Sequence, residues 1–197
     1  EEIQKSRGWL LVYGRRKVGK TYILRNFIKP DNYFLIKRDG SILSIGDKEK
    51  EYSDLGGFVN RLSSILADGR MVVIDEFQRL PRGIWDRISL FHPNGRLIIS
   101  GSSFRIVDKI LSDRSPLLGL FYPVKISLIS PPDIVNGLSK IMSDEEAITM
   151  APYMRDPWTI PMLENVKDIM EIIPTLKYVV PSLIGEVFSE EQRDLSR

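Results

Sequence analysis

The sequence contains no cysteine and only one histidine among its 197 residues. Disulfide bonds and cysteine-ligated metal sites are therefore excluded. No apolar run approaches the roughly 20 residues that span a bilayer, and the polar segment Glu1–Lys5 does not resemble a signal peptide. We therefore expect a cytoplasmic protein.

The sequence also lacks an excess of charge of either sign. Lysine and arginine number 28 and aspartate and glutamate 26, for a formal net charge of +2. This balance argues against nucleic-acid binding through bulk charge. Hydrophobic residues make up 43% and charged residues 27%, as in an ordinary globular protein. The length allows one substantial core, with or without a small appendage.

The segment Gly14–Thr21 matches the phosphate-binding pattern G-x-x-x-x-G-K-[ST]. Glycines let the backbone turn tightly, so that successive N–H groups can face phosphate oxygens. Lys20 would reach the β- and γ-phosphates, and the Thr21 hydroxyl would ligate Mg²⁺. The predicted nucleotide-binding residues are Gly14, Arg15, Arg16, Lys17, Val18, Gly19, Lys20, Thr21 and Tyr22.

The flanking residues have the order that this motif requires. The apolar run Trp9–Tyr13 precedes the loop as a strand, and the apolar spacing from Tyr22 to Phe27 predicts a helix that ends near Pro30. The N-terminus of that helix would add a favourable dipole for an anion. A glycine turn that merely carries a lysine is the alternative interpretation.

Two adjacent acids, Asp75 and Glu76, follow the apolar run Met71–Ile74. A carboxylate at this strand end can reach the Mg²⁺ held by Thr21, directly or through water, so the predicted metal ligands are Thr21 and Asp75. Glu76 could orient or deprotonate the attacking water, which favours hydrolysis over transfer to a substrate hydroxyl. A strand end that simply meets solvent is the structural alternative.

A third polar site follows the next apolar strand, at Ser100 and Ser102. A small hydroxyl there could bind the γ-phosphate or the water, although a serine–glycine turn is an equally open interpretation. We predict Lys20, Glu76 and Ser102 as the catalytic residues. Charge neutralisation in the transition state often needs an arginine. The candidates, which the sequence does not rank, are Arg79, Arg82, Arg105 and Arg114.

Strands alternate with helices up to about residue 128, which predicts an α/β fold with a parallel sheet. Apolar patterns predict helices over 54–67, after Pro81, over 104–111 and after Pro131, whereas residues 37–53 read as a solvated excursion. We expect a nucleotide-binding domain over residues 1–130 and a small helical lid over 131–197. The five predicted strands are 9–13, 32–36, 71–74, 97–100 and 124–128.

Three segments together resemble the archaeal P-loop ATPases of the STAND group within the AAA-like superfamily: Val12–Thr21, Val73–Gln78 and Ile99–Ser103. Ser115–Gly119 and Glu186–Arg193 are also similar to that family. The resemblance implies a three-layer sandwich around a five-stranded parallel sheet in the order 5-1-4-3-2, with the sensor strand between the loop strand and the Asp-Glu strand. It also implies a helical lid and then a winged-helix domain, which we expect to be absent because the chain stops where that domain would begin.

The sequence thus predicts Mg²⁺-dependent binding and hydrolysis of ATP by a molecular switch. Adenine is favoured because no Asn-Lys-x-Asp run for guanine is present. The alternative is a regulatory nucleotide-binding module with little turnover that controls assembly or partner binding. It is favoured by Leu120, which stands where the family usually has an arginine. We expect a homo-oligomer or a protein partner, no membrane, and nucleic acid only through a winged-helix domain.

Overall fold

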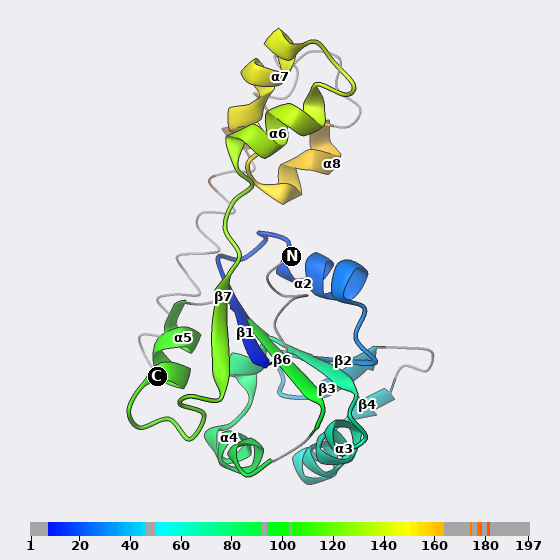
Figure 1. Ribbon diagram of the computed structural model, residues 1–197, viewed down its shortest axis with the longest axis vertical. Coiled ribbons are helices and arrows are strands. Elements are labelled where there is room, and N and C mark those ends of the chain that lie inside the picture. The colour runs from blue at the N-terminus through cyan, green and yellow to red at the C-terminus, as the bar shows by residue number, and fades with distance from the viewer. Residues whose placement is uncertain are drawn as a thin grey trace. The chain divides into compact units, whose positions relative to one another are not determined.

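The computed structural model describes residues 8–45, 50–91, 94–102 and 104–163, and the single positions 174, 177, 178 and 181. The chain divides into two compact units (Figure 1). The first comprises Lys20–Ile126 together with the chain up to Arg15, and the second comprises Arg16–Gly19 together with the chain from Ser127 onward. Each unit is described by itself.

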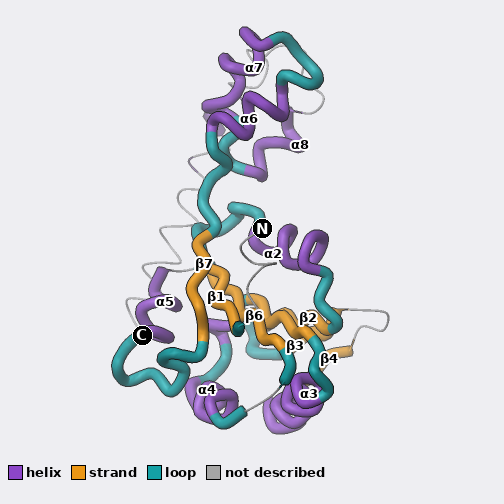
Figure 2. The backbone as a smooth tube through the Cα atoms, in the orientation of Figure 1, coloured by secondary structure: helices purple, strands orange, loops and turns teal. Residues whose placement is uncertain are grey.

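The first unit is built on a seven-stranded sheet with the order β4-β3-β2-β5-β6-β1-β7 (Figure 2). β1, β2, β5, β6 and β7 pair in parallel as β2-β5-β6-β1-β7, and β3 and β4 extend the β2 edge in antiparallel fashion. The sensor strand β6 lies between β1 and β5, as the resemblance implied. The strands are β1 (Trp9–Tyr13), β2 (Asn32–Ile36), β3 (Ile42–Ile45), β4 (Lys50–Tyr52), β5 (Met71–Asp75), β6 (Arg96–Gly101) and β7 (Phe121–Lys125).

The predicted α/β class is confirmed, but the prediction of a five-stranded parallel sheet is wrong, because the sheet is mixed and has seven strands. The segment interpreted as a solvated excursion contains β3 and β4. The segment is mostly polar and its two strands are short, so no strand was predicted there. Ile42, the first residue of β3, is fully buried. The last strand also begins three residues earlier than predicted, at Phe121.

Helices cover both faces of the sheet, because side chains alternate along each buried strand. One face packs Leu11, Phe34 and Ile74 against α3 (Leu55–Ala67), α4 (Arg82–Ser89) and α5 (Phe104–Leu111). The other packs Leu10 and Val73 against α2 (Lys20–Ile23) and the π-helical η1 (Leu24–Ile28). The three layers leave the carboxyl ends of the parallel strands open for a site.

The edge strand β7 lies close to the start of the phosphate loop. Ile126 donates its backbone N–H to Tyr13 O at 2.7 Å, which places Pro123, three residues earlier, with its ring nitrogen on the free edge. Proline there removes no ladder bond and blunts the edge against pairing with another chain. The same close approach fixes Gly14, since a Cβ at that position would lie 2.1 Å from Ile126 O.

The second unit contains α6 (Pro131–Leu138), α7 (Asp144–Met150) and α8 (Ile160–Leu163), with short 3-10 turns η3 (Ala151–Tyr153) and η4 (Pro157–Thr159). Ile134, Leu138 and Ala147 form the centre of its small apolar cluster. The segment 186–193, which carries part of the resemblance, lies outside the described residues. No helix in the part of the chain that the structure describes is long and apolar enough to cross a membrane.

Helix α3 begins at a side-chain cap that the sequence pattern did not reveal. The Asp54 carboxylate accepts hydrogen bonds from Gly56 N at 2.9 Å and Gly57 N at 2.8 Å. These contacts satisfy two backbone donors that the helix leaves unpaired at its first turn.

We predict that Asp54→Ala lowers the free energy of unfolding by about 1 kcal/mol, because both capping bonds are lost. Urea denaturation followed by circular dichroism measures this change. Asp54→Ser should keep most of the stability, since serine is also a good cap. Equal losses in both variants would show that the cap is not the cause.

Candidate functional site

The loop between β1 and α2 contains backbone conformations that few residues adopt. Three residues have positive φ: Gly14 at 154°, Lys17 at 65° and Gly19 at 86°. Glycine reaches this region at no steric cost, whereas a lysine does so only rarely. Alternation of right- and left-handed residues is the geometry that builds anion-binding concavities from backbone N–H groups.

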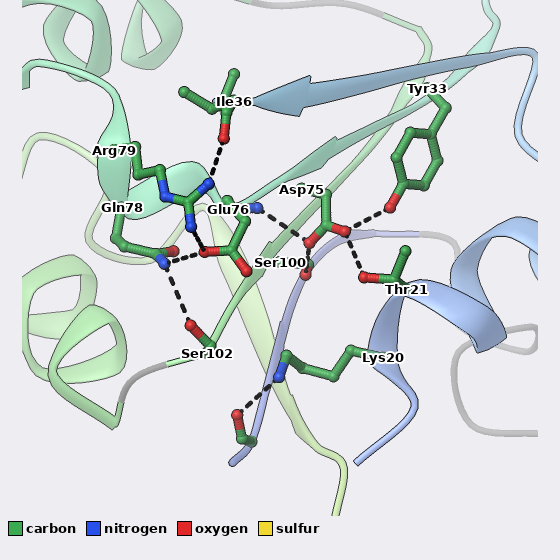
Figure 3. Close-up of polar contacts among 11 residues, drawn as sticks. Lys20, Thr21, Tyr33, Ile36, Asp75, Glu76, Gln78, Arg79, Ser100 and Ser102 are labelled. Atoms are coloured by element: carbon green, nitrogen blue, oxygen red, sulfur yellow. Dashed lines mark hydrogen bonds and ion pairs between the residues drawn. The ribbon is translucent and has the colours of Figure 1, made fainter. Parts of the chain in front are cut away.

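Lys20 opens helix α2 and its side chain is buried. Its Nζ donates to Gly14 O and to Arg15 O, at 2.9 Å in each case, so the ammonium group lies at the start of the loop. Figure 3 shows the Lys20 ammonium group in contact with a backbone carbonyl. A compact charge held at the loop backbone suits a phosphate, which would offer it stronger acceptors than these carbonyls.

Not all predicted loop residues belong to one unit. Gly14, Arg15, Lys20, Thr21 and Tyr22 lie in the first, whereas the segment Arg16–Gly19, with Lys17 and Val18, is assigned to the second. Tyr22 is 63% exposed, and its ring contacts Phe27 edge-on at 5.9 Å.

Asp75 ends β5 and is the centre of the polar cluster. Its side chain is only 2% exposed. Oδ2 accepts from Thr21 Oγ1 at 2.7 Å and from the Tyr33 hydroxyl at 2.5 Å. Oδ1 accepts from Ser100 Oγ at 2.5 Å and from Glu76 N at 3.0 Å (Figure 3). A buried carboxylate is tolerated here because donors from α2, β2, β6 and the residue that follows β5 converge on it.

The four hydrogen bonds account for the roughly four acceptor positions of a carboxylate. An ion that bound Asp75 directly would therefore displace one of these donors. Thr21 still has oxygen lone pairs to offer while its proton points at Asp75. The donor set thus fits Mg²⁺, with Thr21 as the ligand and Asp75 as the group that orients it.

Tyr33 is the second residue of β2, which neighbours β5 in the sheet. Burial raises the pKa of its phenol well above the ordinary value, and the negative charge of Asp75 raises this pKa further. The phenol therefore stays protonated and remains a hydrogen-bond donor to Asp75. Arg25 lies over the Tyr33 ring, with 5.9 Å between its guanidinium carbon and the ring centroid.

Glu76 has a left-handed backbone, with φ 59° and ψ 38°. Such a conformation costs a non-glycine residue about 1–3 kcal/mol and concentrates at functional sites. Its Oε2 accepts from Gln78 Nε2 at 2.7 Å and forms an ion pair with Arg79 Nη2 at 3.1 Å. Arg79 is itself anchored by Nη1, which donates to Ile36 O at 2.7 Å.

The two serine candidates have different positions. Ser100 is fully buried and donates to Asp75. Ser102 instead contacts Gln78, with 3.4 Å between Ser102 Oγ and Gln78 Nε2. Of the arginine candidates, Arg79 joins the cluster, and Arg82 and Arg114 are exposed. The side chain of the fourth candidate, residue 105, lies outside the described part.

Sequence reasoning missed two members of the site, Tyr33 and Gln78, and gave Arg79 no particular role. An aromatic residue inside a strand is typical of a core, so nothing marked the Tyr33 hydroxyl as functional. Gln78 lies two residues after Glu76, where the short η2 turn (Phe77–Arg79) brings it back toward the strand ends. The sequence analysis did not predict this turn, and therefore it did not place Gln78 in the site.

A glycine-bearing loop between a strand and a helix, with a lysine and a hydroxyl at the helix start and acids at a neighbouring strand end, defines the P-loop nucleotide-binding class. Residues 6–117 match the family model described as AAA domain, which is more than half of the chain. The chain therefore belongs to the AAA domain family. Proteins of this family generally bind ATP or ADP with Mg²⁺. No curated protein sequence matches the chain.

Several solved structures are similar to this chain over part of their length or all of it. The Aeropyrum pernix ORC1 protein in complex with DNA is 17% identical, with a TM-score of 0.43 over 72% of this chain and 44% of its own. Domain III of the Thermotoga maritima replication initiation protein DnaA is 16% identical, with a TM-score of 0.44 over 89% of this chain and 87% of its own. Bacteroides Pif1 bound to ssDNA is 17% identical, with a TM-score of 0.33 over 74% and 47%. The chain spans less than half of the ORC1 chain.

We predict that the stability of the metal-free protein falls as pH rises above about 10, the ordinary pKa of tyrosine. The pKa of Tyr33 is raised in the folded state, so above pH 10 the unfolded chain loses a proton that the folded chain keeps, and stability declines. The slope from this one group is about 1.4 kcal/mol per pH unit. Urea titrations at several pH values measure it.

Tyr33→Phe should flatten this decline, and should also lower stability near neutral pH because Asp75 loses a donor. Tyr153→Phe, at an exposed tyrosine of the second unit, is the matched control and should keep the wild-type pH dependence. An unchanged slope in Tyr33→Phe would contradict the assignment.

Proposed function

We propose that this chain binds ATP with Mg²⁺ and hydrolyses it, acting as a nucleotide-dependent switch. The observation that carries the proposal is the hydrogen bond of 2.7 Å between Thr21 at the start of α2 and Asp75 at the end of β5. It joins the phosphate loop to the acidic strand end, two segments that are 54 positions apart in the sequence. The motifs of the sequence also support an assignment to the archaeal STAND group.

In this proposal Lys20 and the loop amides hold the phosphates, and Thr21 holds Mg²⁺. The metal would offset phosphate charge. Asp75 accepts a hydrogen bond from the Thr21 hydroxyl, which would leave the lone pairs of that oxygen free for the metal. Ser100 and Tyr33 keep the carboxylate in that orientation.

Glu76 is the group that would accept a proton from the attacking water. One of its oxygens, Oε2, is engaged by Gln78 and Arg79. Its side chain is 18% exposed, so that water can reach the carboxylate. Ser102 would sense the γ-phosphate from the end of β6.

A second function remains a candidate: a regulatory module that binds ATP with little or no turnover and controls assembly or partner binding. Leu120 supports it, because this apolar residue stands where the resemblance places an arginine, and it is 38% exposed. Arg114 is a possible substitute on the same connection. Comparing the oligomer size with ADP and with a non-hydrolysable ATP analogue, alongside single-turnover rates, distinguishes the two functions.

We predict that Lys20→Ala abolishes ATP binding, whereas Glu76→Gln keeps binding and lowers turnover by about 100-fold or more, as expected for loss of a general base. Fluorescent-nucleotide titration and phosphate release measure the two effects. Lys109→Ala and Glu145→Gln, at exposed positions in α5 and α7, are the matched controls and should behave as wild type. Absence of turnover in the wild-type protein, with no effect of Glu76→Gln, would exclude hydrolysis.

A further inference from the structure

Gln78 connects the ends of two strands that the proposed reaction uses. Its Nε2 donates to Glu76 Oε2 at 2.7 Å and lies 3.4 Å from Ser102 Oγ (Figure 3). An amide nitrogen carries two hydrogens, so both contacts can be made together. Gln78 therefore lies between the residue proposed to activate water and the residue proposed to sense phosphate.

The orientation of this amide is fixed by its surroundings. If the amide were turned over, its oxygen would face the Glu76 carboxylate, and two acceptors would repel one another. In the orientation observed, Gln78 Oε1 is buried without a hydrogen-bond partner among the described residues. Leaving a buried acceptor unpaired costs free energy. The amide is thus held by what its nitrogen contacts.

The space for this side chain depends on Gly101, the last residue of β6. A Cβ on Gly101 would lie 2.8 Å from Gln78 Oε1 and 3.0 Å from Ile106. The glycine at that strand end therefore leaves the room that the amide occupies, directly beside Ser102. A change in the position of Ser102 would therefore move the Gln78 amide.

Arg79 also holds the Glu76 carboxylate, through the same oxygen that Gln78 contacts. Its guanidinium contacts Glu76 Oε2 at 3.1 Å while it is anchored to Ile36 O at the end of β2. Arg79 holds the carboxylate against a fixed point of the sheet. Gln78 is the residue that connects Glu76 to Ser102, which follows β6.

We propose that Gln78 is a positioning residue that couples Ser102 to Glu76. When Ser102 changes its contacts, Gln78 changes the alignment of the Glu76 carboxylate for water activation. This inference rests on the proposed hydrolysis and names how that site is regulated. Gln78 does not touch the reacting atoms in this role. Its loss should reduce kcat and leave nucleotide affinity nearly unchanged.

A double-mutant cycle tests the coupling. Gln78→Met keeps the length of the side chain and removes its hydrogen bonds, and we expect kcat to fall about tenfold while KM and the ATP dissociation constant stay within about threefold. Ser102→Ala should also lower kcat. The double variant should lose no more than the larger single loss, because both act through one connection. In a Glu76→Gln background, Gln78→Met should have no further effect.

The control is Asn60→Leu on α3, which removes a surface amide and the 3.1 Å hydrogen bond that it accepts from Arg87 on α4, and should leave kcat unchanged. Should Gln78→Met fail to fold, Gln78→Asn replaces it, since it keeps the amide and shortens its reach. The coupling is overturned if the wild-type protein turns over ATP and the kcat losses of the two single variants multiply in the double variant. It is also overturned if neither Gln78 variant loses kcat. Absence of wild-type turnover overturns the proposed hydrolysis instead.

Discussion

The site depends on one buried carboxylate. Asp75 has lost its solvation at the end of β5, and four hydrogen bonds compensate for that loss. Their donors come from α2, β2, β6 and the residue that follows β5. Each bond requires its own element to stay in register, so the parallel order of the central strands and the position of α2 are tied to one functional group.

The same strand end also determines the conformation of the catalytic candidate. Because Glu76 N donates to Asp75 Oδ1, the chain turns sharply after β5, and Glu76 takes a left-handed conformation. The η2 turn that follows returns Gln78 and Arg79 to the Glu76 carboxylate. Strain in the backbone of Glu76 is therefore balanced by contacts within four consecutive residues and by the anchor of Arg79 on β2.

Much of this arrangement could be predicted from the sequence, because its signals are local. The loop pattern, the apolar run before Asp75 and the serines at the end of β6 are each contained in a stretch of a few residues. Carboxyl ends of parallel strands meet at one edge, so their proximity followed. The contact of Tyr33 with Asp75 could not be predicted, because it depends on the register of β2 with β5, and a tyrosine in a strand is typical of a core.

Two parts of the fold were missed for related reasons. β3 has four residues and β4 has three, so neither is long enough to show an alternating pattern, and both are held by pairing, β3 with β2 and β4 with β3. β7 begins at Phe121, three residues before the predicted strand, and it includes Pro123, because an edge strand tolerates proline on its free side. The end of the chain is predicted as a helical lid, and this stays a prediction.

The most direct test of the central claim is the effect of Mg²⁺ on ATP affinity, measured by calorimetry in the wild-type protein and in Asp75→Asn. If Asp75 orients Thr21 toward the metal, Mg²⁺ should tighten ATP binding in the wild type and have little effect in the variant, while metal-free ATP binding stays similar in both. Equal tightening by Mg²⁺ in the two proteins would contradict the role assigned to Asp75.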